Sequence, residues 1–465
     1  MPNENLSSRV NNGVDVVAPI RTLREWLRRL ETSGRVAKTR PGIPLQFTLA
    51  ALAKRLDGQK ATVFPSPGDH PLTVVSGLVS QRSWIAEVLG VSEAEVVQAY
   101  RDAVDNPVPW IECDSDAAPV HQHIRQEVDL TRDLPIPTHN EHDNGAYITA
   151  GLVIAANPKT GHQNVSINRL QVSGANRLGV LILPRDLHRF FDAAESEGEA
   201  LDVAIAIGVD PLTLLASQAI LPIDHDELMV AGALHGEPLR VVKCATNGVR
   251  VPADAEIVLE GRILPNAREM EGPFGEFPQY YGPAGKRQVI EIDAITHRDA
   301  PLYHTIVPAA MEHLLLGAIP REASLLAHLQ RTSPGVVDVH LSRGGVCRYH
   351  LWVKLRKRWE GEPKNVIASA FAGHADIKQV IVVDDDVDIH DPVSVEWAVA
   401  TRFQASQDLV VMAGALGSRL DPSSDDGIVD KVGFDATKPV AADPFRFTVV
   451  HVPGEDDADV EGWLE

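Results

Sequence analysis

The sequence predicts an α+β protein in three consecutive parts, and the distribution of local patterns supports this class. Helix and strand patterns are mixed in residues 1–105, short strands with few helices fill residues 106–305, and strands alternate with helices in residues 306–465. The patterns therefore predict an N-terminal α+β unit, a central β-barrel and a C-terminal α/β domain. A chain of 465 residues, 44% of them hydrophobic, is long enough for more than one core.

A helix is expected at the start of the N-terminal unit. Thr22 can cap it, and Glu25 can close a capping box with Thr22. Leu23, Leu27 and Leu30 then recur at helical spacing. These signals predict an amphipathic helix with one apolar face.

Two strands and a second helix complete this unit. The strands are predicted at Ala61–Phe64 and Leu72–Val75, with Pro/Gly turns between them. Ser92 and Glu95 form a second capping box, which predicts the start of another helix. The proline-rich stretch Asn106–Pro109 is the predicted linker to the next part.

The central part is expected to consist mostly of strands. They are predicted at Tyr147–Ala156, Asn164–Val172, Leu178–Leu183, Leu201–Gly208, Arg240–Cys244 and Gln288–Thr296. Helices predicted at Asp186–Glu195 and Pro211–Gln218 interrupt them. Many short strands with few helices are typical of a barrel.

The last part has the alternation of an α/β domain. A long helix is predicted at Met311–Gln330 and a shorter one at Val393–Arg402. Strands are predicted at Val336–Leu341, Tyr349–Val353 and Gln379–Val383.

Composition excludes several classes of protein. The formal net charge of −21 argues against a nucleic-acid-binding protein, whose binding face is basic. No apolar run is long enough to insert in a membrane, and Met1–Asn12 lacks the apolar core of a signal peptide, so a cytoplasmic protein is expected. Cys113, Cys244 and Cys347 are too widely separated to predict a metal-ligand pair or a disulfide framework.

The stretch Met270–Gln279 is the strongest candidate for a functional loop. It places Glu271 and Glu276 on a segment with two glycines and two prolines, which fits neither a helix nor a regular strand. Closely spaced carboxylates push each other's pKa values apart, so one can stay ionised while the other holds a proton. The alternative is a surface loop with two solvated glutamates.

Three motifs in this order resemble the UbiD family of decarboxylases, which use prenylated FMN. They are the Glu-Gly-Pro-Phe-Gly-Glu string of the loop, the Asn-x-x-x-x-Arg string in Asn164–Val172 and the Gly-Glu-x-x-x-Val-Val-Lys-Cys string in Gly236–Cys244. The resemblance runs from about Tyr147 to Arg298 and weakly on to about Pro439.

The resemblance implies the architecture and partners of the chain. It implies that residues 106–305 form a split β-barrel that binds the flavin, and that residues 306–465 help form a homodimer or a higher homo-oligomer. A separate prenyltransferase would supply the prenylated FMN. A cofactor is also expected from the chemistry, because decarboxylation needs an electron sink and the chain has no obvious Schiff-base lysine motif. The lack of a Gly-x-Gly-x-x-Gly motif argues against a Rossmann dinucleotide site.

The activity implied by the resemblance is a reversible, non-oxidative decarboxylation that releases CO₂. The expected substrate is an aromatic, heteroaromatic or α,β-unsaturated carboxylic acid, with a pyrrole- or indole-carboxylate favoured. Other hypotheses are the family's polyprenyl-hydroxybenzoate decarboxylase of ubiquinone synthesis, a flavin-binding protein without turnover, and a structural α/β protein whose motifs are coincidental.

A metal site is expected from Asn164, His188 and Glu237. An amide oxygen, an imidazole and a carboxylate suit Mn²⁺ or Mg²⁺, which could bridge the protein to a flavin phosphate. In the family an Asn and a Glu at the first and last of these positions do this, and K⁺ is a further candidate cation. The alternatives are a surface histidine for His188 and a turn carboxylate for Glu237.

Arg169, Glu271 and Glu276 are the predicted catalytic residues. The guanidinium can hold one carboxylate ionised while the other keeps a raised pKa, and Glu276 is the expected proton donor. Arg169 follows Asn164 by five residues, so on one strand the two would face opposite sides, and a bulge or bend is required. The alternative for Arg169 is a salt bridge that only stabilises the fold.

The remaining expected contacts surround the cofactor and the substrate. The expected cofactor contacts are Asn164, Ser166, Ile167, Asn168, Arg169, Leu183 and Lys431, although a solvated lysine is the favoured alternative for Lys431. Leu183, Phe277 and Met311 could line the substrate pocket, and His313 could hydrogen-bond a ring NH. For the three apolar residues a plain core position is the alternative.

Overall fold

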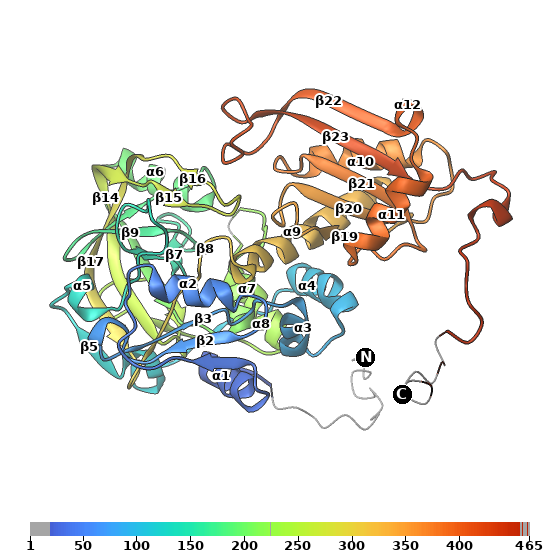
Figure 1. Cartoon of the computed structure of the whole chain (residues 1–465). Helices are drawn as coiled ribbons and strands as arrows, with labels where there is room; N and C mark the ends of the chain where they lie inside the picture. Colours follow the sequence, from blue (N-terminus) through green and yellow to red (C-terminus); the bar gives the residue numbers. More distant parts are fainter. Residues whose placement is uncertain (1–18, 224, 456–457, 459–462, 464–465) are drawn as a thin grey trace, which may run out of the picture. The chain divides into compact units, whose positions relative to one another are not determined.

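The chain forms two compact units in the computed structural model, which describes residues 19–223, 225–455, 458 and 463. The first unit comprises residues 1–324 with 420–422, and the second comprises residues 325–419 with 423–465. The Met1–Asn12 stretch lies outside the described residues. Both units contain helices and strands, which confirms the predicted α+β class (Figure 1). The three-part division at residues 105 and 305 stays a prediction.

The first unit begins with a small sheet and the helices that pack around it. The sheet has the order β1 (Val36–Lys38), β2 (Ala61–Phe64), β3 (Thr73–Ser76) and β18 (Leu302–His304). The N-terminal helices are α1 (Leu23–Thr32), α2 (Thr48–Arg55), α3 (Arg82–Leu89) and α4 (Val96–Asp105). Because β18 comes from far along the chain, the chain returns to this sheet after the central part and adds its last strand.

Both predicted capping boxes are present. Thr22 and Glu25 cap α1, and the leucines of the predicted apolar face are buried with Trp26. Ser92 and Glu95 form the second box on a short 3₁₀ turn, Glu93–Glu95, which leads directly into α4. Each box satisfies backbone N–H groups that a helix start would otherwise leave unpaired.

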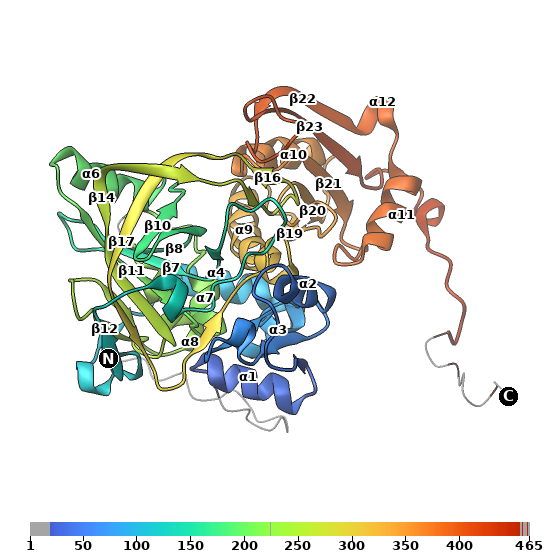
Figure 2. The same cartoon turned by 60° about the vertical axis from the view of Figure 1, so that its left-hand side comes forward.

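A nine-stranded sheet is the main feature of the first unit. Its order is β6 (Tyr147–Ile148), β9 (Leu170–Gly174), β10 (Arg177–Val180), β17 (Gly285–His297), β14 (Ile257–Glu271), β11 (Leu201–Ile207), β7 (Leu152–Ala156) and β8 (Gln163–Ile167), with β5 (His123–Arg125) also paired to β17. The sheet curls along β14 and β17 (Figures 1 and 2). The outermost strands β6 and β8 do not pair with each other, so the barrel is split, as predicted.

Short helices and small sheets accompany the curled sheet. The helices are α5 (Leu130–Asp133), α6 (Asp186–Ser196), α7 (Pro211–Ala216) and α8 (Glu227–His235). One small sheet has the order β13 (Arg250–Pro252), β12 (Arg240–Lys243) and β4 (Ile111–Glu112), and the other pairs β15 (Phe274–Gly275) with β16 (Tyr281–Gly282). Short 3₁₀ turns lie at Pro67–Asp69, Ser115–Ala117, Pro119–His121 and, in the second unit, Pro444–Phe447.

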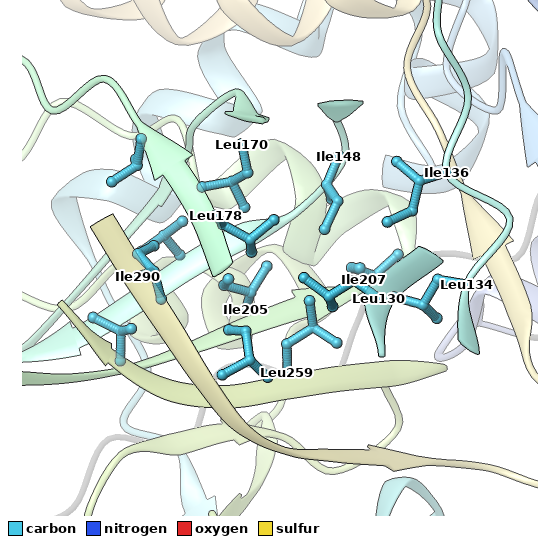
Figure 3. Close-up of a cluster of buried hydrophobic side chains, with 14 of the residues drawn as sticks. Leu130, Leu134, Ile136, Ile148, Leu170, Leu178, Ile205, Ile207, Leu259 and Ile290 are labelled. Atoms are coloured by element: carbon cyan, nitrogen blue, oxygen red, sulfur yellow. The ribbon is translucent and has the colours of Figure 1, made fainter. Parts of the chain in front are cut away.

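A core of aliphatic side chains fills the curled sheet. Figure 3 shows Leu170, Leu178, Ile205, Leu259 and Ile290 from five different strands pointing toward one another. All are fully buried. This packing fixes the strands whose ends carry the polar residues described below.

The second unit contains a five-stranded sheet. Its order is β19 (Val336–Leu341), β20 (His350–Leu355), β21 (Gln379–Asp384), β23 (Ile428–Ala436) and β22 (Leu409–Leu416). Its helices are α10 (Glu362–Gly373), α11 (Pro392–Arg402) and α12 (Ala405–Asp408), and α9 (Met311–Thr332) contains the boundary between the units. Within the described part of the chain, no helix is both long and apolar enough to cross a membrane.

Candidate active site

Arg169 lies between the two glutamates of the predicted catalytic loop. Its Nη2 donates a hydrogen bond to Glu271 Oε2 at 2.8 Å, and its Nη1 donates a very short one to Glu276 Oε1. The side chains of Arg169, Glu271 and Glu276 are 9%, 0% and 14% exposed. The structure therefore brings together all three predicted catalytic residues in a nearly water-free position.

The backbone explains how Asn164 and Arg169 can both serve one region. Asn164 belongs to β8, which ends at Ile167, and β9 begins at Leu170. Arg169 lies in the break between these strands, so the alternation of a single strand does not apply to it. This strand break is the bend that the five-residue spacing between Asn164 and Arg169 requires.

The carboxylates come from the end of a long strand and from the loop that follows it. Glu271 is the last residue of β14, and Glu276 follows β15 directly. A Cβ on Gly282 would lie 2.9 Å from Arg169 Nη1, so a glycine there leaves room for the guanidinium. The loop thus supplies the carboxyl group of Glu276, and Gly282 leaves space for the Arg169 guanidinium that binds it.

The segment around Asn140–Asn144 holds the loop in place. Asp143 accepts hydrogen bonds from the backbone N–H groups of Gly275 and Asn140, each at 2.8 Å. The ring of Phe274 lies 5.5 Å from the Arg169 guanidinium carbon, in a cation–π arrangement. The loop is therefore ordered and largely buried, and the alternative of a solvated surface loop does not describe it.

Burial and neighbouring charges have opposite effects on the pKa values of Glu276 and Arg169. Burial raises the pKa of Glu276, and the adjacent Arg169 offsets only part of that rise. Burial alone would lower the pKa of Arg169, but the charges of Glu276 and Glu271 outweigh it and raise this pKa. Glu276 can therefore hold a proton at a pH where a solvated glutamate is ionised, which a proton donor requires.

A buried tyrosine completes the surroundings of Glu271, and the sequence reasoning did not name it. The Tyr147 hydroxyl lies 3.3 Å from Glu271 Oε1 and 3.0 Å from Gln171 Oε1. The Gly272 N–H donates to both the Tyr147 oxygen and Gln171 Oε1. Tyr147 lies opposite Gln171 in the β6–β9 pair, so the sequence could have identified it only if the strand register had been known.

The predicted metal ligand Asn164 contacts a carboxylate, but it is not the predicted one. Asn164 Nδ2 donates to Glu227 Oε1 at 3.0 Å, and the Val165 N–H donates to Glu227 Oε2 at 2.7 Å. Burial raises the pKa of Glu227 to about 8. The sequence reasoning missed Glu227 because it missed α8, although Asp226 before an apolar run is an N-cap signal.

Glu237 lies at the other end of the same helix. It follows Gly236, the C-cap of α8, and forms an ion pair with Arg21 at 2.5 Å with its side chain 54% exposed. Glu237 stays a predicted ligand, while Glu227 is the carboxylate that contacts Asn164.

His188 lies in the first turns of α6. Its Nδ1 is 2.8 Å from Asp192 Oδ2, and its side chain is one-third exposed. The charge of Asp186, from the same turn, contributes to the raised pKa of Glu227, so the start of α6 faces that carboxylate. Among the described residues, no group of three or more His, Cys, Asp or Glu side chains is arranged around a common metal position.

The chemistry of these donors nevertheless fits a divalent cation. A buried carboxylate with a raised pKa binds its proton because no positive charge is close, and a cation would replace that proton. The side-chain amide of Asn164 donates an N–H to Glu227, which leaves its carbonyl oxygen available as a metal ligand. Oxygen ligands of this kind suit Mn²⁺ or Mg²⁺.

The predicted cofactor contacts of the first unit cluster around the same strand break. Ser166 and Ile167 end β8 and are half-buried, and Asn168 Nδ2 donates to Ser166 Oγ at 2.9 Å. Leu183 follows β10 and is exposed. Arg169 Nε is buried with no hydrogen-bond partner among the described residues, which fits a bound group that accepts a hydrogen bond there.

Lys431 belongs to the second unit and is not the solvated lysine that the sequence favoured. It lies on β23, is almost completely buried, and donates from Nζ to the Ala375 carbonyl at 2.8 Å. Burial lowers its pKa. The predicted contact with a flavin stays a prediction.

The predicted substrate-pocket residues have different surroundings. Phe277 is buried, and Met311 is partly buried at the first position of α9. The Ala309 N–H donates to His313 Nδ1 at 3.2 Å. The proposed places of these residues in a substrate pocket stay predictions.

Comparison with family models gives two adjacent matches. Residues 111–311 match the 3-octaprenyl-4-hydroxybenzoate carboxy-lyase Rift-related domain of the UbiD family. Residues 314–436 match the corresponding C-terminal domain. The first match contains every predicted site residue except Lys431, which the second contains, and His313, which lies between the two matches.

Individual relatives cover most of the chain. An anhydromevalonate phosphate decarboxylase of Methanothermobacter thermautotrophicus is 42% identical over 80% of this chain and 87% of its own. A gallate decarboxylase of Lactiplantibacillus plantarum is 32% identical over 75% of this chain and 76% of its own.

The solved structures include the UbiD-class enzyme HmfF from Pelotomaculum thermopropionicum in complex with FMN. It is 49% identical, has a TM-score of 0.94, and covers 95% of this chain and 100% of its own. An evolved dimeric form of HmfF in complex with prFMN is 46% identical, has a TM-score of 0.90, and covers 96% of this chain and 100% of its own.

Proposed function

Since the chain belongs to the UbiD family of carboxy-lyases, we propose that it is a decarboxylase that uses prenylated FMN, with Arg169, Glu271 and Glu276 as its catalytic residues. The observation that carries this proposal is the buried Arg169 clamp between two carboxylates on an ordered loop. Related proteins bind FMN and prFMN, which supports the choice of cofactor.

The proposed roles follow from the protonation chemistry of the cluster. Glu276 delivers a proton to the carbon that loses CO₂, since burial favours its protonated form. Arg169 holds Glu276 in place and links it to Glu271, which keeps the guanidinium oriented through its own hydrogen bond. The prenylated flavin, when bound, supplies the electron sink that no side chain here offers. In the reverse direction Glu276 would take this proton back from the carbon, and the same carbon would form a bond to CO₂.

The proposed cofactor site combines the strand break with a divalent cation. Asn164 and Glu227 would hold Mn²⁺ or Mg²⁺, with His188 as the third protein ligand after its contact with Asp192 opens. The flavin would lie against Ser166, Ile167, Asn168, Arg169 and Leu183, and a contact with Lys431 stays a prediction. K⁺ also stays a prediction, and a separate prenyltransferase would supply the cofactor.

The proposed substrate is an aromatic, heteroaromatic or α,β-unsaturated carboxylic acid, with a pyrrole- or indole-carboxylate as the favoured member. The relatives carry names that include gallate and anhydromevalonate phosphate decarboxylase, so both acids belong among the candidates. A polyprenyl-hydroxybenzoate is the second candidate, because the family model bears that substrate's name.

Reconstitution tests the proposed function. The purified chain is loaded with Mn²⁺ and prenylated FMN, and CO₂ release is measured from pyrrole-2-carboxylate, indole-3-carboxylate, gallate, anhydromevalonate phosphate and a prenylated 4-hydroxybenzoate. Release from at least one acid, dependent on prenylated FMN and absent with plain FMN, is expected. A flavin-loaded chain that releases CO₂ from none of them would favour a flavin-binding protein without turnover.

A homodimer is the proposed assembly, with β22 at its interface. This outermost strand, Leu-Val-Val-Met-Ala-Gly-Ala-Leu, has no charged residue, and Val411 and Leu416 are 62% and 66% exposed. No described strand pairs with its outer edge. A long apolar edge strand aggregates unless another strand covers it, and a second copy can do so symmetrically across a two-fold axis.

A further inference from the structure

We propose that Tyr147, with Gln171 as an alternative acceptor, is a positioning residue that keeps Glu271 hydrogen-bonded in both of its protonation states. The inference rests on the proposed function, because it concerns the glutamate that shares Arg169 with the proton donor. Tyr147 and Gln171 face each other in the β6–β9 pair, and both are buried beside Glu271.

The hydrogen bonds around the Tyr147 hydroxyl leave two possible acceptors for its proton. The Gly272 N–H donates to the hydroxyl oxygen at 3.1 Å, so that oxygen already accepts one hydrogen bond. The hydroxyl proton can point to Glu271 Oε1 at 3.3 Å or to Gln171 Oε1 at 3.0 Å. A hydroxyl has one proton, so only one of these bonds exists at a time.

The choice follows the charge of Glu271. When Glu271 is ionised, the Tyr147 O–H donates to its Oε1, and Arg169 holds the other oxygen. When Glu271 is protonated at Oε1, its own O–H donates to the Tyr147 oxygen, and the Tyr147 O–H turns to Gln171 Oε1. Only the proton on Glu271 is gained or lost, and no buried group is left without a partner in either state.

The surroundings keep this arrangement rigid. Gln171 Nε2 donates to the Asn144 carbonyl at 2.5 Å, so the amide cannot flip without losing that bond. The side-chain carbons of Glu271 lie 3.5 Å from the position of a Cβ on Gly179, which leaves them in contact with β10. Burial raises the pKa of Tyr147 far above its usual range, so the residue acts as a neutral hydroxyl.

The charged and titratable groups that face Glu271 come from three segments. Arg169 lies in the β8–β9 connection, Tyr147 in β6, and Glu276 faces it across the guanidinium from the loop after β15. Tyr147→Phe removes the donor that stabilises ionised Glu271, so its titration should move to higher pH. Gln171→Met removes the alternative acceptor, so the hydroxyl always points to Glu271 and the titration should move to lower pH.

Infrared pH-difference spectra of the chain without flavin or substrate test the inference. The Glu271 carboxyl band is identified by its loss in Glu271→Gln. Its midpoint should rise by about one pH unit in Tyr147→Phe and fall in Gln171→Met, since a hydrogen bond to a charged group is worth roughly one such unit or more. Tyr303→Phe is the control, because Tyr303 is fully buried and its hydroxyl has no hydrogen-bond partner among the described residues.

Two results would overturn the inference. An unmoved midpoint in both variants would show that Tyr147 does not face the titrating oxygen, and a shift of the same sign in both would show a general packing effect. If Tyr147→Phe does not fold, the Gln171→Met shift alone decides. In the reconstituted enzyme, Tyr147→Phe should move the pH–rate profile with little change in KM. Failure of the wild-type chain to release CO₂ would contradict the proposed function and leave the infrared result standing.

Discussion

At the scale of single residues, the site depends on the two hydrogen bonds that the Arg169 guanidinium donates, one to Glu271 and one to Glu276. A buried arginine with one carboxylate would be a stable ion pair, but a second carboxylate adds negative charge that the guanidinium neutralises only in part. The proton that balances the cluster then belongs to the carboxyl whose pKa burial raises, Glu276. A proton held on Glu276 is what its proposed role as proton donor requires.

The planar fork of Arg169 is expected to be essential. In Arg169→Lys the charge remains, but a single ammonium cannot hold Glu271 and Glu276 at the two observed positions. CO₂ release by the reconstituted enzyme should fall by at least about a hundredfold, as for loss of a positioned acid–base group, while flavin absorbance is retained. Turnover close to wild type would mean that the arginine only stabilises the fold.

Metal retention distinguishes Glu227, the first residue of α8, from Glu237, which follows the C-cap of the same helix. Glu227→Gln should weaken Mn²⁺ binding by more than about tenfold, because it removes the charged oxygen beside Asn164. Glu237→Gln is the matched control and should bind Mn²⁺ like wild type, since its carboxylate pairs with Arg21. Isothermal titration with Mn²⁺ measures both. The reverse order of effects would restore Glu237 as the ligand.

At the scale of elements, the N-terminal helix is attached to the curled sheet by one buried ion pair. Arg24 of α1 donates to both oxygens of Glu256, at 2.8 and 2.7 Å, and Glu256 is fully buried. Removing the arginine would leave an unpaired buried charge, which is costly. Part of the cost is offset, because the Leu302 N–H and Arg298 still approach the carboxylate.

Arg24→Ala should therefore lower the free energy of unfolding by about 1–3 kcal/mol, less than for a fully buried pair because Arg24 is about one-third exposed. Arg28→Ala changes an exposed arginine of the same helix and should have an effect within about 0.5 kcal/mol. Urea unfolding of both variants gives the comparison. Equal effects would show that Arg24 contributes only through helix propensity.

The elements also show what local patterns can and cannot predict. Capping boxes and leucine spacing correctly predicted α1 and the start of α4, because their signals lie within a few residues. The segments Tyr147–Ala156 and Asn164–Val172 were each predicted as one strand and are two, since strand breaks depend on pairing with distant partners. The 15-residue strand β14 was missed because Pro265 and Asn266, which are turn residues, interrupt its pattern where the pairing register shifts.

The same limitation applies to the predicted metal set. The Asn-x-x-x-x-Arg and Glu-Gly-Pro-Phe-Gly-Glu strings predicted Asn164, Arg169, Glu271 and Glu276. In the fold Arg169 contacts both of these glutamates, and Asn164 contacts Glu227. Glu227 lies on an unrecognised helix, and its closeness to Asn164 follows from packing of α8 on β8. Motif spacing alone could not choose between Glu227 and Glu237.

At the scale of the whole molecule, the two units contribute different things. The first unit holds the acid cluster and the Asn164–Glu227 contact within one curled sheet. The second unit carries Lys431 and the exposed apolar strand β22. Composition correctly predicted more than one core, but the boundary within α9 follows from contacts that no local pattern records.

The assembly is expected to depend on β22. Val411→Glu places a charge at the centre of its exposed face, so the homodimer should dissociate to monomers. Val393→Glu is the control, because Val393 is equally exposed on α11 of the same unit. Sedimentation equilibrium measures the mass of each. A Val411→Glu chain that remains dimeric would place the interface elsewhere.

Solvent-deuterium exchange into the decarboxylated product tests the central claim most directly, because exchange uses the same proton as turnover. The measurement compares wild type with Glu276→Gln, both loaded with Mn²⁺ and prenylated FMN. The amide has nearly the shape of the acid, so flavin absorbance and metal content should match wild type, while exchange should fall by about 10²–10⁴-fold. Exchange above about a tenth of the wild-type rate, with the cofactor retained, would contradict the assignment of Glu276 as the proton donor.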